Sequence, residues 1–203
     1  MNMKTHHSPL LKWTIALALS LSALACSKND NAPSGASTAG VAKTGITASS
    51  LDTVASQAKG FSVGAVMSAQ TTYVLFDPQC PHCGRLWEAS LPLHNTMKFV
   101  WVPISFGSPK SMPQGAALLS AANPLEAMNA HEKSLLGGSG GMAASSDVPR
   151  EMREAIEANT KLLTSLGVDS VPFLIGKNRQ TGSLITHTGA MDTAALAQLL
   201  GLN

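Results

Sequence analysis

Two cysteines, Cys80 and Cys83, stand three positions apart and enclose the dipeptide Pro81-His82. Thiols at this spacing can close a disulfide with one another, and so can exchange it with a second thiol pair. The preceding run Thr71–Phe76 is rich in β-forming residues and predicts a strand. Proline is tolerated in the first turn of a helix. The cysteine pair is therefore predicted where a strand ends and a helix begins.

This position predicts different roles for the two sulfur atoms. Unpaired N–H groups at a helix N-terminus and the helix dipole favour a thiolate, and the imidazole of His82 adds to this effect. We therefore expect the pKa of Cys80 to lie below the ordinary thiol value of about 8.5. Cys80 is predicted to attack, and Cys83, one turn further into the helix, to resolve the mixed disulfide. Pro81 and His82 are predicted to tune the pair.

Other uses of the Cys-x-x-Cys spacing fit less well. A zinc site would need two of His94, His131 and His187, whose spacings do not match known pairs. Attached haem needs histidine directly after the second cysteine, where Gly84 stands. We expect no metal and no cofactor, and place His131 and His187 at the surface.

Two alternatives stay open. One is a copper chaperone that holds Cu(I) between the two thiolates and a histidine or methionine, although no third soft ligand lies near the cysteines at a spacing that indicates a copper site. The other is a lipoprotein with an inert structural disulfide, although so short a loop stabilises a fold little.

Periodicity predicts the elements around the pair, and their order predicts an α/β sandwich. The unit from the first strand through its helix to the second strand implies parallel pairing, and the last two strands form a hairpin. We predict helices at residues 49–59, 81–95, 114–120, 124–136, 149–166 and 192–200, and strands at residues 71–76, 97–104, 171–175 and 184–187.

The N-terminal segment indicates export. Two lysines precede the apolar run 13–24, which is too short to span a bilayer and ends in small residues, so residues 1–25 are predicted to be a signal peptide. Cys26 follows directly, as in the lipobox of bacterial lipoproteins, and is a candidate for lipidation. Residues 26–47 predict a flexible linker, and residues 48–203 one folded domain.

The charge pattern argues against a nucleic-acid partner. The whole chain carries 14 basic and 12 acidic residues, and charged residues make up only 13% of it. Removal of residues 1–25 takes away Lys4 and Lys12 and leaves no formal net charge. We therefore expect contact with a membrane only through a lipid on Cys26.

The segment Phe76–Cys83, followed by Trp87, resembles the active-site segment of the thioredoxin-fold disulfide-bond proteins of the bacterial periplasm, especially the DsbC/DsbG group. This resemblance covers about residues 70–203. It implies a thioredoxin-like sandwich with a mixed central sheet and a helical insert at about residues 111–166. It also implies a thiol-disulfide oxidoreductase whose cis-proline loop, Val171-Pro172, faces the redox pair and binds substrate.

By the same resemblance, the partners are cysteine-containing periplasmic proteins and a redox partner that recycles the pair. Val171 stands where the family usually has threonine, which makes the substrate-facing loop more apolar. The family carries an N-terminal dimerisation domain, whereas only about 50 residues separate Cys26 from the predicted strand at residues 71–76, so we expect a monomer. The dipeptide Pro81-His82 is that of DsbA, which implies a pair more oxidising than that of thioredoxin. Oxidase, isomerase and reductase roles all stay open.

Overall fold

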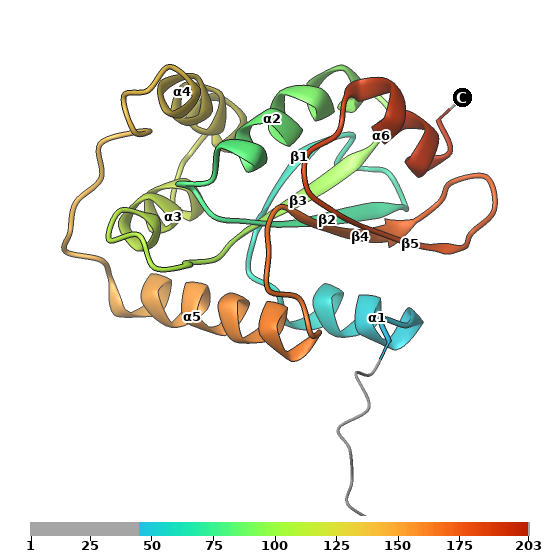
Figure 1. Cartoon of the computed structure of the whole chain (residues 1–203), viewed down its shortest axis with the longest axis horizontal. Helices are drawn as coiled ribbons and strands as arrows, with labels where there is room; N and C mark the ends of the chain where they lie inside the picture. The colour runs from blue at the N-terminus through green and yellow to red at the C-terminus, as the bar shows by residue number, and fades with distance from the viewer. Residues whose placement is uncertain (1–44, 203) are drawn as a thin grey trace, which may run out of the picture. The chain divides into compact units, whose positions relative to one another are not determined.

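A computed structural model of the protein describes residues 45–202 (Figure 1). The predicted signal peptide, Cys26 and residues 26–44 of the predicted linker lie outside these residues. The helices are α1 (Ala48–Gln57), α2 (Pro81–Ser90), α3 (Ser111–Leu119), α4 (Pro124–Leu136), α5 (Arg150–Ser165) and α6 (Thr193–Leu200), with a 3-10 turn η1 (Leu91–Leu93). The strands are β1 (Phe61–Gly64), β2 (Thr71–Phe76), β3 (Lys98–Pro103), β4 (Phe173–Lys177) and β5 (Leu184–Thr188).

The five strands form one mixed sheet in the order β1-β3-β2-β4-β5. Strands β2 and β3 pair in parallel, and the other pairs are antiparallel. These pairings confirm the predicted parallel unit and the C-terminal hairpin. Strand β1 was not predicted. It has only four residues, too few for a clear alternating pattern, and it is held by pairing with β3.

Helices cover both faces of the sheet (Figure 1). Successive side chains of a strand point to opposite faces. Val74 and Phe76 of β2 accordingly pack in the cluster that contains residues of α2 and α6. Leu75 lies between them in sequence and packs in the other cluster, with residues of α1 and α5. The central strand β2 is therefore buried on both sides, which fixes the end of the strand where the cysteines begin.

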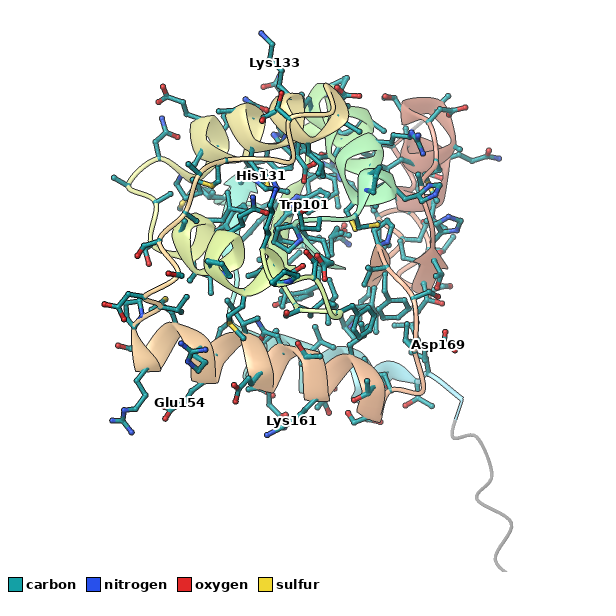
Figure 2. All side chains as sticks on the ribbon, turned by 60° about the vertical axis from the view of Figure 1, so that its left-hand side comes forward. Trp101, His131, Lys133, Glu154, Lys161 and Asp169 are labelled. Atoms are coloured by element: carbon teal, nitrogen blue, oxygen red, sulfur yellow. The ribbon has the colours of Figure 1, made fainter. Side chains whose placement is uncertain are left out.

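The predicted insert at residues 111–166 contains helices with two different locations. Helix α5 packs beside α1 against the sheet, so it belongs to the layer that covers the core. Helix α4 packs against α2, and α3 lies between α4 and α5, in contact with both. Figure 2 shows Lys133 of α4 pointing into solvent and His131 lying against the body of the domain. No helix within residues 45–202 is long and apolar enough to cross a membrane.

Candidate redox site

Cys80 is the N-cap residue of α2. The Asp77-Pro78 sequence ends β2 in a turn, in which the backbone N–H of Cys80 donates to the carbonyl oxygen of Asp77 at 2.9 Å. Pro81 then occupies the first helical position, where a missing N–H is harmless. The first cysteine therefore lies at the strand-to-helix junction, as predicted.

The surroundings of Cys80 favour its thiolate. Its pKa is lowered to about 6, mainly because the Cys83 thiol donates a hydrogen bond to it. Partial burial opposes this shift, whereas the backbone N–H groups of Cys83 and His82 and the charge of His82 add to it. The His82 ring is exposed, and its Nδ1 atom lies 3.2 Å from Nη1 of Arg85.

Cys83 has the opposite character. Its side chain is fully buried, and burial raises its pKa well above the ordinary value. The hydrogen bond to Cys80 and the charges of Cys80 and Glu132 raise it further. Cys80 and Cys83 are not joined by a disulfide in this structure. The pair therefore combines a half-buried thiolate with a buried thiol at neutral pH.

The Val171-Pro172 loop faces the redox pair. The Val171-Pro172 peptide bond is cis, which confirms the expectation from the resemblance. The Sγ atom of Cys80 lies 3.6 Å from the carbonyl oxygen of Val171, to which the protonated thiol donates. A hollow of about 190 Å³ opens beside this contact. Its lining consists of Asp77, Gln79, Cys80, Phe106, Ser108 and Val171.

Asp77 holds the turn in place through its buried carboxylate. The Oδ1 atom accepts hydrogen bonds from the backbone N–H of Gln79 at 2.8 Å and from the hydroxyl of Ser111. The Oδ2 atom accepts from the backbone N–H of Phe106 at 2.6 Å. With three donors, this buried carboxyl group is satisfied, and it ties the end of β2 to the loop before α3.

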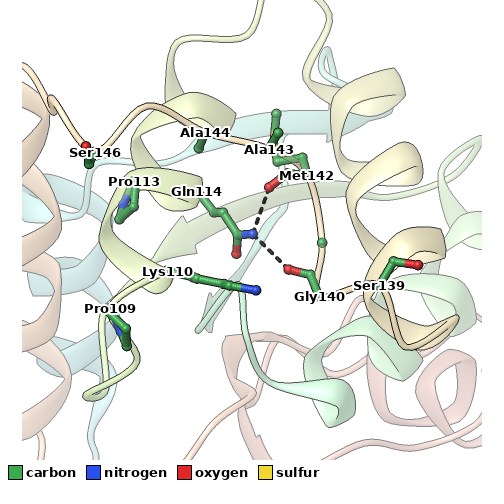
Figure 3. Close-up of a pocket in the computed structure, with 11 residues that line it drawn as sticks. Pro109, Lys110, Pro113, Gln114, Ser139, Gly140, Met142, Ala143, Ala144 and Ser146 are labelled. Atoms are coloured by element: carbon green, nitrogen blue, oxygen red, sulfur yellow. Dashed lines mark hydrogen bonds between the residues drawn. The ribbon is translucent and has the colours of Figure 1, made fainter.

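Helix α3 and the glycine-rich loop after α4 hold the residue before Cys80. The side-chain NH₂ of Gln79 donates to Gln114 Oε1 at 2.6 Å and to the Gly140 carbonyl oxygen at 2.9 Å. Figure 3 shows the Gln114 amide in turn bridging the carbonyl oxygens of Gly140 and Met142 at the edge of a pocket of about 440 Å³. Sequence reasoning missed this network because the partners lie 26 to 61 positions apart.

The prediction that His131 lies at the surface is wrong. Its ring is fully buried, and Nε2 donates to the carbonyl oxygen of Pro78 at 2.8 Å. The Nδ1 atom accepts from the backbone N–H of Met142 at 3.1 Å. Because one ring nitrogen donates and the other accepts, the imidazole is neutral, in agreement with a pKa that burial lowers. His131 therefore connects α4 and the glycine-rich loop to the turn before Cys80.

Glu132, also missed, places a buried carboxyl group next to the redox pair. Its side chain is 1% exposed, and neither carboxyl oxygen has a hydrogen-bond partner. Burial, followed by the charges of Cys80 and Glu88, raises its pKa to about 8. At Gly84, the residue after Cys83, a Cβ atom would lie 2.5 Å from Glu132 Oε2. The glycine therefore makes room for the carboxyl group against α2.

The sequence contained a signal for these two residues. His131 and Glu132 follow the buried Met128 by three and four positions, and Leu135 and Leu136 continue the same stripe. This spacing places residues on one face of a helix. Polar residues on such a stripe are candidates for a buried network. Within residues 45–202, no group of three histidine, cysteine or acidic side chains is arranged to hold a metal ion.

The geometry agrees with comparisons to known proteins. No family model matches the chain. Over 140 residues it is 27% identical to the thiol:disulfide interchange protein DsbG of Pseudomonas aeruginosa, covering 68% of this chain and 54% of the relative. Over 131 residues it is 26% identical to DsbG of Escherichia coli, covering 64% and 52%. A solved periplasmic thioredoxin-like protein from Salmonella enterica superposes with a TM-score of 0.55 at 18% identity, covering 76% of this chain and 95% of that one.

The described domain has a thioredoxin-like fold, and its sequence is similar to that of the DsbG proteins. This confirms the fold and the family resemblance that the cysteine segment implied. The chain spans about half the length of the DsbG relatives it matches. This DsbG-like domain also contains the pair of sulfur atoms described above. One is a half-buried thiolate at the helix N-terminus, and the other is a buried thiol one turn later.

Proposed function

We propose that the protein is an exported thiol-disulfide oxidoreductase acting on cysteine-containing periplasmic proteins. The observation that carries this proposal is the division of the pair into a half-buried Cys80 with a pKa of about 6 and a buried Cys83 with a raised pKa. A thiolate is the attacking species in disulfide exchange. Cys80 therefore attacks first, and Cys83 resolves the mixed disulfide and closes the Cys80-Cys83 bond.

The client binds in the hollow beside Cys80. Phe106 on one side is 38% exposed, and Val171 on the other adds a second apolar side chain. A peptide segment with an apolar residue next to its cysteine fits this lining. Pro172 shapes the loop that presents Val171, and Pro81 and His82 tune the thiolate. The domain works as a monomer, and a separate redox partner recycles the pair.

The resolving step provides a test of the assignment. In a full-length chain that carries Cys26→Ser, Cys83→Ala should accumulate mixed disulfides with client proteins, because nothing resolves them. The matched variant Cys80→Ala should accumulate none. Non-reducing gels of acid-quenched periplasmic extracts measure both. Equal trapping by the two variants would contradict the assignment of Cys80 as the nucleophile.

The thiolate environment also supports an oxidising pair, because stabilisation of the thiolate favours the dithiol over the disulfide. The equilibrium reduction potential against glutathione distinguishes a disulfide donor or isomerase from a reductase. Lipidation of Cys26 is a separate proposal, supported by the position of this cysteine directly after the predicted signal peptide. Mass spectrometry of the mature N-terminus tests it.

A further inference from the structure

We propose that Glu132 accepts the proton of the Cys83 thiol when Cys83 resolves a mixed disulfide held at Cys80. This inference rests on the proposed function. It gives α4, an element outside the cysteine motif, a direct part in the exchange reaction. Three independent features of the structure support it: the burial of Glu132, its unpaired oxygens and its approach to α2.

The first two features distinguish Glu132 from an ordinary structural carboxylate. Buried carboxylates are normally satisfied by donors, as Asp77 is by three. Both oxygens of Glu132 are buried without a partner. Leaving such a group in the core is unfavourable for the fold, and it has the free acceptor capacity that a base requires.

The third feature is its location against the redox helix. Gly84 follows Cys83, and its missing side chain leaves the space that Glu132 Oε2 occupies. A negative charge on Glu132 is close enough to raise the pKa of Cys83, and a thiolate at Cys80 raises the pKa of Glu132. The buried thiol and the buried carboxyl group are thus electrostatic neighbours.

Few other charges face Glu132. Helix α2 presents Cys80, Cys83 and Glu88, whose charge also raises the pKa of Glu132. On α4 itself, His131 is neutral and bonded to Pro78, and Lys133 is exposed. The other elements packed against α4 are α3 and β1, and neither contains a titratable side chain. The thiolate at Cys80 is therefore the charge near Glu132 that changes during the reaction.

The charge on Cys80 determines when Glu132 can accept a proton. While Cys80 is a thiolate, its charge helps to keep Glu132 protonated. Formation of the mixed disulfide removes that charge, so Glu132 loses its proton more readily and becomes a base. The Cys83 thiol then gives its proton to Glu132, and its sulfur forms a bond with Cys80 Sγ. The bond between Cys80 and the client breaks, and the client sulfur leaves as a thiolate with the electron pair. The cysteine pair is oxidised, and the client disulfide is reduced.

A two-phase reaction with 5,5′-dithiobis(2-nitrobenzoic acid) tests the proposal. In a full-length Cys26→Ser chain with one equivalent of reagent, attack by Cys80 releases one coloured thiolate, and resolution by Cys83 releases the second. At pH 7, Glu132→Gln should slow the second phase by about 100-fold, the lower range for general-base catalysis. The first phase should change by less than about twofold, because Cys80 is already ionised.

Controls separate a chemical role from a structural one. Glu132→Asp should restore part of the second-phase rate, and the second phase of Glu132→Gln should recover with rising pH as solvent takes the proton. Glu157→Gln removes an exposed charge from α5 and should leave both phases unchanged. If Glu132→Gln fails to fold, a selective slowing of the second phase in Glu132→Asp carries the test.

The possible failures are distinguishable. A second phase in Glu132→Gln within threefold of the wild type, or equal slowing of both phases, would overturn the role of Glu132 while leaving the redox pair intact. Absence of the first phase in the wild type, or its persistence in Cys80→Ala, would instead overturn the proposed function.

Discussion

In the reduced protein, the Glu132→Gln variant should lose less stability than the wild type as the pH rises from 5 to 7. Burial raises the pKa of Glu132 to about 8 in the folded chain, from the ordinary value of 4.5. Between these values the folded chain holds a proton that the unfolded chain has released. Rising pH therefore favours unfolding of the wild type, the reverse of the usual behaviour of a salt-bridged carboxylate. Glutamine has no proton to release, so the variant lacks this contribution.

The size of the effect follows from linkage. One proton bound only by the folded chain lowers the free energy of unfolding by about 1.36 kcal/mol per pH unit. From pH 5 to pH 7 the change amounts to roughly 2 to 3 kcal/mol, because the titration is incomplete at both ends of the interval. Glu132 is 1% exposed, so solvent does not screen it. The stability difference between Glu132→Gln and the wild type should grow by this amount over the interval.

Urea denaturation at pH 5, 6 and 7 measures the effect, in a reducing buffer and in the Cys26→Ser chain. A shift in midpoint at constant slope reports stability alone. The control Glu157→Gln removes an exposed carboxylate of α5 and should follow the wild type at every pH. Parallel curves for Glu132→Gln and the wild type from pH 5 to pH 7 would refute the reasoning that Glu132 is protonated in the folded protein.

Two further measurements follow from the site. Iodoacetamide alkylation of Cys80 in the reduced protein should increase with a midpoint near pH 6, and Cys83→Ala should move it upward more than His82→Ala does, because the Cys83 hydrogen bond is the main cause of the lowered pKa. A wild-type midpoint near 8.5 would argue against a stabilised thiolate. Burial lowers the pKa of His131, so acid should destabilise the fold as the pH falls below about 6.5, where the unfolded imidazole gains a proton that the folded one refuses. In urea titrations, the stability of His131→Gln should fall less steeply below pH 6.5 than that of the wild type. An equal loss of stability in both proteins would show that His131 does not contribute to the acid sensitivity.

Local sequence patterns determined most of the elements that carry the redox pair. The β-forming run before Asp77-Pro78 and the proline at the first helical position define the junction at Cys80 without long-range information. Thiol spacing, helix periodicity and the order of strands then predicted a mixed α/β sandwich. The contrast between the two thiols also followed from the position of each along the helix.

The tertiary structure alone decided what surrounds the pair. Strand β1 exists because β3 offers it a partner, and its four residues carry too little local preference to be recognised. The burial of His131 and the unpaired carboxyl group of Glu132 depend on how α4 lies against α2, at positions about 50 residues away in sequence. A periodic stripe shows which side chains face inward, but only the packing shows which of them meet a sulfur atom, a carbonyl group or no partner. These long-range contacts set the desolvation and charge that shift the pKa values of the site.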